Sequence, residues 1–290
     1  MGTEAVGTDA ASVAGQWADC VADGSLDVGQ VARRLVAART EGRTLSATLV
    51  ESVGLTLGDA YRVQDEVTAL RLARGERVVG WKLGYTSLAM REQMGISEPN
   101  LGPLTDAMLL PSGSAVPSTA LQPRVEPEIG LRLARDLSGP CSADAALAAC
   151  AEAVACLEVV DSVWAGYRFA LEDNTADGSS AAWVVVGDPL PMDDLAALQV
   201  ELAVDGEAVA TATGAAAGGH PAVGLAWLAG QLALRGGRVR AGDLVITGGL
   251  TAAYPLLPAG EITARFRWTV PGPARPPAGQ PASVSARGTG

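Results

Sequence analysis

The chain has 290 residues, of which 48% are hydrophobic but only 4% are aromatic. This length suits one large domain, or a core with an N-terminal extension, whose interior Ala, Val and Leu must fill. The net charge is −11 at pH 7 with a pI near 4.6, so the surface repels nucleic acid and anionic membranes. A negatively charged substrate would therefore need a local cation.

The cysteines and the N-terminus indicate a cytoplasmic protein. The four cysteines show no CxxC and no zinc-type spacing with the single histidine, His220, so we expect reduced thiols. The first ten residues, MGTEAVGTDA, lack the basic and apolar regions of a signal peptide. No apolar run approaches the length of a membrane span. We therefore expect contact with neither nucleic acid nor membrane.

Residues 1–76 predict a helical N-terminal region. Helices are expected over 27–40 and over 58–76, and in the second one apolar residues repeat at helical spacing. Thr56 and Asp59 fit a capping box at the start of the second helix, and Gly75 ends it.

Residues 77–270 predict a body rich in strands. Strands are expected over 78–86, from 125, and over 157–160, 181–187, 243–249 and 261–270, with a hairpin over 198–214 that turns at Asp205-Gly206. Helices are expected over 87–95, from 143 to about Cys156, and over 220–237. The Pro/Gly-rich residues 271–290 predict a disordered tail. No Walker loop, GxGxxG after a strand or GxSxG is present, which argues against nucleotide cofactors and an α/β-hydrolase.

Two glutamates, Glu126 and Glu128, lie one residue apart in the strand-like segment RVEPEIG. Residues i and i+2 of a strand share a face, with Cβ atoms roughly 7 Å apart, so the two carboxylates can converge on one divalent ion. Glu158, an acid in an apolar segment, is the candidate third ligand. On spacing alone, the solvated face of an edge strand is the better explanation, and Pro127 favours it.

Three further candidates have ordinary structural alternatives. Lys82, between glycines in GWKLG, is either an active-site cation or a surface lysine. His220 precedes a proline and suits a helix N-cap, and a single histidine cannot form a His-rich metal site. The TGG segment at 247–249 either offers backbone N–H groups to a carboxylate or is a tight turn.

Several segments resemble, in their order, a known family. They are GWKLGYTS, the MG…P…G run of 94–102, PRVEPEIG, LEVVDS, TADGSS, GHPA and TGGLTAA. Over about residues 45 to 270 the chain is similar to the fumarylacetoacetate hydrolase superfamily, in its branch of 2-keto-4-pentenoate hydratases and 4-oxalocrotonate decarboxylases. The resemblance implies an α+β fold, in which a mixed β-sheet roll or barrel core of the fumarylacetoacetate hydrolase C-terminal type lies beside the N-terminal helical region.

The resemblance also implies the residues of the site. Glu126, Glu128 and Glu158 match the family's ligands for Mg²⁺ (or Mn²⁺). Lys82 and Ser180 match catalytic residues, although the segment of Ser180 reads ADGSS, with Gly178 in place of the usual asparagine. Candidates for binding the substrate are Arg124, Arg168, Thr247 and Gly248. A Pro-rich insertion before ASVSARGTG suggests that the family's last strand is lost or displaced.

GHPA, TGGLTAA and Asp161 are more similar to the decarboxylases than to the hydratases. The resemblance therefore implies a metal-dependent decarboxylase of a vinylogous 2-oxo diacid, such as 2-oxo-3-hexenedioate, that acts through a metal-bound dienolate. A 2-hydroxypenta-2,4-dienoate hydratase, a related C–C hydrolase or tautomerase, and a non-catalytic metal-binding protein stay open as alternatives. A role in aromatic catabolism, a homo-oligomer and association with a partner enzyme of the same pathway are also implied.

Overall fold

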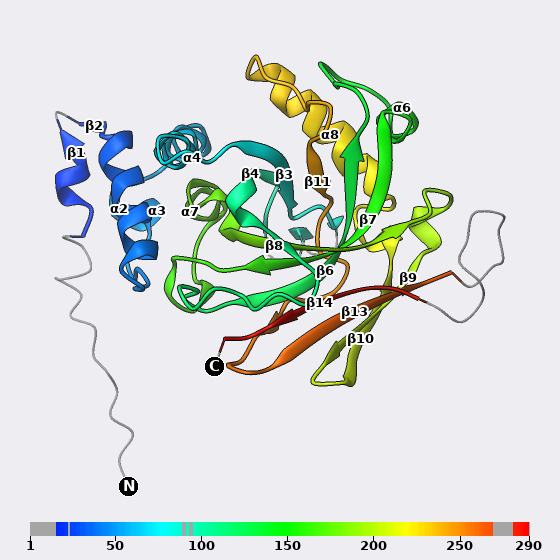
Figure 1. Cartoon of the computed structure of the whole chain (residues 1–290). Helices are drawn as coiled ribbons and strands as arrows, with labels where there is room; N and C mark the ends of the chain where they lie inside the picture. Colours follow the sequence, from blue (N-terminus) through cyan, green and yellow to red (C-terminus); the bar gives the residue numbers. More distant parts are fainter. Residues whose placement is uncertain (1–15, 23, 89–90, 93–94, 269–280, 290) are drawn as a thin grey trace, which may run out of the picture.

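The computed structural model describes residues 16–22, 24–88, 91–92, 95–268 and 281–289. They form a strand-rich body with a group of N-terminal helices on one side of it (Figure 1). The predictions for residues 1–15 and 269–280, and for part of the helix expected over 87–95, fall outside the described residues.

The two long helices predicted near the N-terminus are confirmed. The region comprises η1 (Ala18–Cys20), β1 (Val21–Ala22), β2 (Ser25–Leu26), α2 (Val28–Thr40), α3 (Leu49–Val53) and α4 (Leu57–Leu72). Each α-helix follows a capping residue, Asp27, Thr48 or Thr56, whose side chain accepts a hydrogen bond from the backbone N–H three residues further on. Thr56 therefore caps α4 as predicted, while the Asp59 carboxylate accepts from the Thr56 hydroxyl at 2.7 Å instead of from the backbone N–H that a capping box requires.

The larger sheet of the body is mixed and has the order β4-β3-β11-β6-β7-β8-β5, with β12 also paired to β6. Its strands are β3 (Val78–Gly84), β4 (Asn100–Thr105), β5 (Leu109–Pro111), β6 (Arg124–Leu133), β7 (Cys150–Val160), β8 (Ala181–Leu190), β11 (Leu244–Ile246) and β12 (Tyr254–Pro255). The β11–β3 and β5–β8 pairs are parallel. Strand β6 has partners on both sides, so the edge-strand explanation of its glutamates is wrong.

A smaller antiparallel sheet, in the order β10-β9-β13-β14, lies under the larger one (Figure 1). Its strands are β9 (Gln199–Val204), β10 (Glu207–Thr213), β13 (Glu261–Arg267) and β14 (Ala282–Arg287). The prediction of a disordered tail is wrong for β14, which pairs with β13 and fully buries Val284 and Ala286. Alternating apolar residues give this segment a buried face. The high Pro and Gly content of residues 271–290 as a whole predicted disorder and hid this alternation.

The helix expected from 143 to about Cys156 is also a wrong prediction. Helix α6 spans only Ala143–Leu147, and β7 already begins at Cys150. The alanine-rich sequence favours a helix locally, but β7 pairs along its length with β6 and β8 and buries Val154, Ala155 and Cys156. Tertiary pairing therefore overrides local propensity here.

Helix α8 (Pro221–Leu234) lies beside α6 (Figure 1). Its Leu225 and Leu228 join Ile129 and Leu131 of β6 in the main apolar core. His220 is the N-cap of α8, because its Nδ1 accepts a hydrogen bond from the Ala222 N–H at 3.0 Å. The N-cap explanation of this histidine is confirmed.

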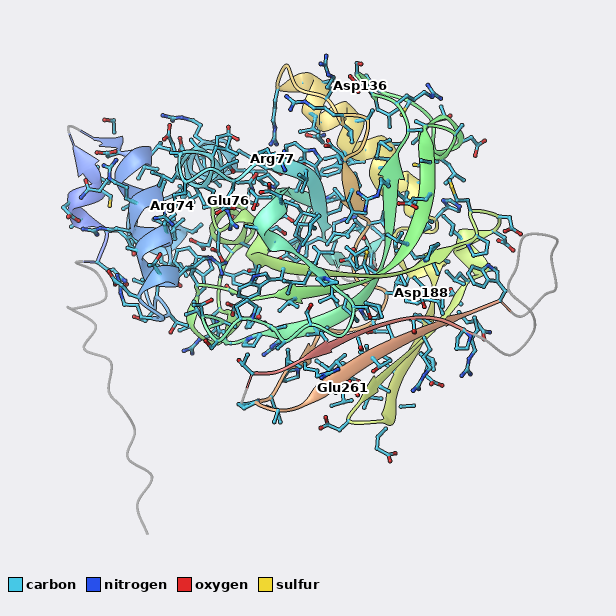
Figure 2. The ribbon with its side chains drawn as sticks, in the orientation of Figure 1. Arg74, Glu76, Arg77, Asp136, Asp188 and Glu261 are labelled. Carbon is cyan, nitrogen blue, oxygen red and sulfur yellow. The ribbon has the colours of Figure 1, made fainter. Side chains whose placement is uncertain are left out.

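The N-terminal helices share an apolar cluster with the body. Trp17 and Leu35 belong to the same cluster as Val163, Trp164 and Ala176, which follow β7. Charged side chains at the junction include Glu76 and Arg77, labelled in Figure 2, which pair with Arg71 at 2.8 Å and Asp106 at 3.0 Å. The shorter elements of the body are α7 (Leu171–Ala176), η2 (Asp106–Met108), η3 (Ala165–Tyr167), η4 (Gly178–Ser180), η5 (Leu195–Ala197) and η6 (Gly214–Ala216).

Candidate metal and substrate site

Neighbouring strands bring the three candidate ligands together. Glu126 and Glu128 share one face of β6, and the β6–β7 register sets Glu126 directly opposite Glu158. One carboxylate oxygen from each residue lies within 4.8 Å of the others. Glu128 and Glu158 are fully buried, whereas Glu126 lines a cavity. The cluster is therefore an interior feature and not a solvated face.

Lys82 of β3 completes this cluster. The residue is 4% exposed, and its Nζ lies 3.0 Å from Oε1 of Glu158. Nζ also donates a hydrogen bond to the carbonyl oxygen of Ser179 at 2.8 Å. The surface-lysine explanation is therefore wrong. Burial alone would lower the pKa of Lys82, but the charges of Glu158, Glu126 and Glu128 outweigh it and raise the pKa.

The glutamate oxygens have too few donors within the protein. Oε2 of Glu128 accepts the N–H of Gly248 at 2.6 Å. Oε1 of Glu128 and both oxygens of Glu158 are buried without a hydrogen-bond donor among the described residues, so Oε1 of Glu158 has only its ion pair with Lys82. Burial, reinforced by the charge of Glu158, raises the pKa of Glu126 to about 8 and that of Glu128 well above its ordinary value.

These residues fit a hard divalent cation. Three carboxylates without a histidine or cysteine form the oxygen donor set that Mg²⁺ and similar ions prefer. Buried carboxylate oxygens that lack donors are costly unless a proton or a cation shares them. The orphaned oxygens of Glu128 and Glu158 are thus the structural observation that favours a metal ion between the three residues.

Thr247 and Gly248 of the TGG segment are buried beside the glutamates, whereas Gly249 lines the cavity in front of them. Thr247 is fully buried, and its hydroxyl donates to the carbonyl of Ile129 at 2.9 Å. The Gly248 N–H is already bonded to Glu128. A Cβ on Gly249 would lie 2.1 Å from Oε2 of Glu126, so this position needs glycine for close approach. Neither Thr247 nor Gly248 lines the cavity, so the structure does not bring these two predicted substrate-binding residues to it.

A cavity of about 510 Å³ opens in front of the cluster. Lys82, Glu126, Ser179 and Ser180 line its polar side. The Oγ of Ser180 accepts a hydrogen bond from Nδ2 of Asn174 at 2.9 Å. The structure therefore brings both predicted catalytic residues, Lys82 and Ser180, to the same cavity as the carboxylates.

The other wall of the cavity is aromatic and includes Arg124. Tyr85, Tyr167 and Phe169 line it. The guanidinium of Arg124 lies 4.4 Å from the centre of the Tyr167 ring, a cation–π distance, and Arg124 forms no ion pair with any described residue. Arg168 is exposed and does not line the cavity. The structure therefore does not bring Arg168 to the cavity, and Tyr167 is the residue that this turn presents there.

Among the lining residues that sequence reasoning missed are Tyr85, Tyr167, Asn174 and Ser179. Tyr85, Tyr167 and Ser179 have left-handed backbones, with φ near 59°, as does Ser180. Non-glycine residues in this conformation cluster at functional sites. No sequence pattern signals such a conformation in tyrosine, although Ser179 and Asn174 lie within or next to TADGSS.

Comparisons with known proteins agree with this geometry. The family model "Fumarylacetoacetate (FAA) hydrolase C-terminal" matches residues 86–272. A 2-hydroxypent-2,4-dienoate hydratase of Pseudomonas putida is 35% identical over 211 residues, which are 71% of this chain and 95% of that protein. A 4-oxalocrotonate decarboxylase of Pseudomonas sp. (strain CF600) is 38% identical over 192 residues, which are 64% of this chain and 73% of that protein.

A solved structure shows the same fold. It is the 4-oxalocrotonate decarboxylase from Pseudomonas putida G7, complexed with magnesium and adipate, with a TM-score of 0.82 and 33% identity. The match covers 90% of this chain and 97% of that one. No helix of the described residues combines the length and apolar composition needed to cross a membrane. The curled mixed sheet, its N-terminal helices and these matches confirm the expected fold, and the chain belongs to the fumarylacetoacetate hydrolase family.

Proposed function

We propose that this protein is a divalent-metal-dependent decarboxylase of a 2-oxo diacid such as 2-oxo-3-hexenedioate. The main observation behind the proposal is that Arg124, Glu126 and Glu128, at every second residue of β6, lie on the same face of the strand. This face offers a carboxylate cluster for a cation at one end and a separate positive charge at the other. The relatives named 4-oxalocrotonate decarboxylase support the same reaction.

Glu126, Glu128 and Glu158 would hold the metal ion, with Mg²⁺ as the first choice and Mn²⁺ as the second. A bound ion of this kind supplies Lewis-acid polarisation of the 2-oxo group. Lys82 keeps Glu158 in place through its 3.0 Å ion pair. Because Lys82 also lines the cavity, its ammonium stabilises the negative charge that develops on the 2-oxo oxygen.

Arg124 would bind the second carboxylate of the substrate. Adjacent residues on one face of a strand are roughly 7 Å apart, which is close to the span between the terminal carboxylates of an extended six-carbon diacid. Stacking on Tyr167 restrains the guanidinium, so it loses little conformational freedom on binding. Arg124 would thereby fix the orientation of the carbon–carbon bond that breaks.

The reaction itself is an electron shift along the substrate. The bond from C5 to the distal carboxylate breaks, its electron pair forms the C4–C5 double bond, and the C3–C4 pair moves to C2–C3 while the 2-oxo oxygen becomes negative. CO₂ leaves, and a proton on that oxygen completes 2-hydroxypenta-2,4-dienoate. The aromatic wall of Tyr85, Tyr167 and Phe169 shields the departing group from water.

A hydratase of 2-hydroxypenta-2,4-dienoate is the second candidate. It needs the same cluster and Lys82, and the relative with the fuller coverage is named a hydratase. It makes no use of Arg124, which is why we rank it second. A hydrolase with a histidine base has less support, because His220 caps α8 and does not line the cavity. We further propose a cytoplasmic homo-oligomer active in aromatic catabolism, which associates with a partner enzyme of that pathway.

The direct test of the function supplies each substrate with Mg²⁺. We expect CO₂ release from 2-oxo-3-hexenedioate and slower or no loss of the absorbance of 2-hydroxypenta-2,4-dienoate. Chelation with EDTA should abolish turnover, and added Mg²⁺ should restore it. Turnover of neither substrate by protein that binds Mg²⁺ would reject both candidate functions, whereas turnover of the dienol alone would establish the hydratase.

Replacing Glu128 by Gln removes a charge but keeps the shape of the ligand. We expect Mg²⁺ affinity, measured by calorimetric titration, to fall by at least the roughly 10–100-fold seen when partners of metal ligands are lost. Glu152→Gln is a matched control on β7, because it breaks only the surface ion pair with Arg132. Equal affinities of the Glu128→Gln variant and the native protein would remove Glu128 from the ligand set.

The raised pKa of Glu126 predicts how Mg²⁺ affects stability. Its carboxyl keeps a proton up to about pH 8 in the folded state, whereas the unfolded chain loses that proton near its ordinary pKa. The folded state therefore binds more protons within this window, and the free energy of unfolding of metal-free protein falls as pH rises through it.

A bound cation replaces those protons. The increase in melting temperature on adding Mg²⁺ should therefore grow between about pH 6 and about pH 8. Thermal melts with Mg²⁺ and with EDTA measure it, and Glu126→Gln should flatten the dependence. An increase that is the same at both pH values contradicts this account.

Replacing Arg124 by Met tests the second carboxylate site. A charged hydrogen bond contributes about 1.5–3 kcal/mol, so KM for the diacid should rise roughly 10–150-fold. The value of kcat should change less, because Arg124 stabilises the carboxylate before it leaves. Arg168→Met, an exposed arginine outside the cavity, is the control. A KM that stays at the native value in Arg124→Met would show that the diacid is bound elsewhere.

A further inference from the structure

Three consecutive residues beside the cavity have left-handed backbones. Gly178, Ser179 and Ser180 have φ values of 67°, 59° and 55°. This conformation costs roughly 1–2 kcal/mol for each non-glycine residue, so it persists only where surrounding contacts hold it. The turn matters because the Ser179 carbonyl accepts the hydrogen bond of Lys82 and because both serines line the cavity.

The end of the turn is held from within the body. The Asp161 N–H donates to the carbonyl of Ser180 at 2.9 Å, and Asn174 donates to the Ser180 hydroxyl. The Ser179 hydroxyl donates to Oδ1 of Asn100 at 2.8 Å. At the start of the turn, the Asp177 N–H donates to the carbonyl of Asp173 at 3.1 Å, and the Asp177 carboxylate makes further contacts.

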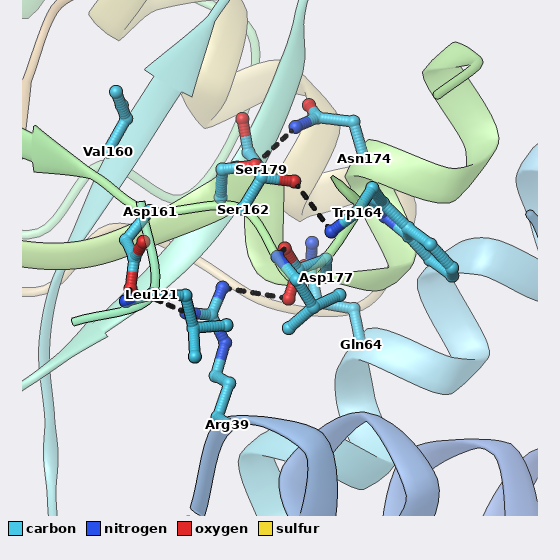
Figure 3. Close-up of polar contacts among 12 residues, drawn as sticks. Arg39, Gln64, Leu121, Val160, Asp161, Ser162, Trp164, Asn174, Asp177 and Ser179 are labelled. Atoms are coloured by element: carbon cyan, nitrogen blue, oxygen red, sulfur yellow. Dashed lines mark hydrogen bonds and ion pairs between the residues drawn. The ribbon is translucent and has the colours of Figure 1, made fainter. Parts of the chain in front are cut away.

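Arg39 of α2 fixes the start of the turn. Its Nη2 lies 2.8 Å from Oδ1 of Asp177 (Figure 3). The other carboxylate oxygen of Asp177 accepts the Val163 N–H at 3.1 Å. Asp177 is buried. Burial raises the pKa of this carboxyl to about 6, and the charge of Arg39 opposes the rise. Arg39 therefore supplies the positive charge that pairs with the buried carboxylate of Asp177.

The same guanidinium reaches toward a second buried acid. Its Nη1 lies 3.8 Å from Oδ2 of Asp161, three residues after Glu158. Asp161 accepts hydrogen bonds from the N–H groups of Leu121 and Gln122, just before Arg124. Arg39 thus connects the turn at Ser179, the end of β7 and the chain entering β6.

We propose that Arg39 is a positioning residue of the active site, which holds the turn Gly178–Ser180 and thereby the ammonium of Lys82. The inference rests on the proposed function, because the turn serves the catalytic cavity. It gives the N-terminal helices a role in catalysis, although Arg39 is 138 residues away from Asp177 in the chain. Arg71 and Arg74 line the same second cavity as Asp177 and Gly178, but among the described residues they form no hydrogen bond or ion pair with the turn.

Arg39 can be reached from solvent without entering the catalytic cavity. Its side chain is 26% exposed and lines a second cavity of about 340 Å³, together with Asp177 and Gly178. This second cavity shares no lining residue with the first. A small cation added to the solution can therefore occupy the space that a shortened side chain leaves there.

The test compares Arg39→Ala, Arg39→Lys and a matched control, Arg62→Ala, which breaks an exposed ion pair with Asp59 on α4. With saturating Mg²⁺ and the diacid substrate, we expect Arg39→Ala to lose about 10–100-fold in kcat, with KM and Mg²⁺ affinity within about twofold of native values. Millimolar guanidinium should restore part of kcat. Arg39→Lys keeps the charge but not the two-pronged geometry, so its kcat should be intermediate.

Hydrogen exchange supplies a readout that does not depend on turnover. Amides of residues 177–182 should exchange faster in Arg39→Ala and at the native rate in Arg62→Ala. If the native protein turns over no substrate, the proposed function fails, and the exchange comparison still decides the role of Arg39. Unchanged exchange and kcat in Arg39→Ala, or an equal loss in Arg62→Ala, would overturn the inference. Should Arg39→Ala not fold, a native kcat in Arg39→Lys would overturn it as well.

Discussion

Like-charge repulsion between three glutamates is the constraint on which this structure depends. The register of β6 and β7 sets Glu126 opposite Glu158, and the strand period adds Glu128 on the same face. Lys82 and the Gly248 N–H offset part of the charge, but among the described residues Oε1 of Glu128 and Oε2 of Glu158 still lack a donor. Two central strands, β6 and β7, carry the three glutamates, and a cation between them would offset their repulsion. The close approach of Gly249 and the buried Thr247 serve the same end, because they hold the glutamates and leave the cavity to the substrate.

Backbone strain is concentrated at the same place. Seven described non-glycine residues have a positive φ, and four of them, Tyr85, Tyr167, Ser179 and Ser180, line the cavity. Close packing explains how the strain is retained: a Cβ on Gly102 would lie 2.3 Å from the Gly178 carbonyl, and one on Gly84 would lie 2.6 Å from the Ser179 hydroxyl. The left-handed turn is therefore pressed against β3 and β4, where it meets Lys82. Strain of this kind preorganises a site at the expense of stability.

Most of the fold and the polar half of the site follow from the sequence. The strand period, the capping residues and the ordered family motifs predict the helices, most strands, the glutamates and Lys82. The failures have physical causes. Strand β7 was obscured by alanine propensity, and β14 by the composition of the tail around it. The left-handed tyrosines and Arg39 depend on contacts between segments far apart in the chain, and no local pattern records these. Arg124 and Arg168 were both predicted to bind substrate, and the structure places only Arg124 in the lining of the cavity.

The positions of the charges in the cavity separate the two candidate reactions. A divalent cation and Lys82 together balance Glu126, Glu128 and Glu158, so the positive charge of Arg124 is left for the substrate. A substrate with one carboxylate would use the cation and leave Arg124 half-buried with only Tyr167 beside it. A diacid pairs it, and a net charge of −11 makes such a local cation necessary for a dianion to enter. Under the proposed function, the glutamates hold the cation that polarises the substrate, and Arg124, two positions before Glu126 on β6, would select a diacid.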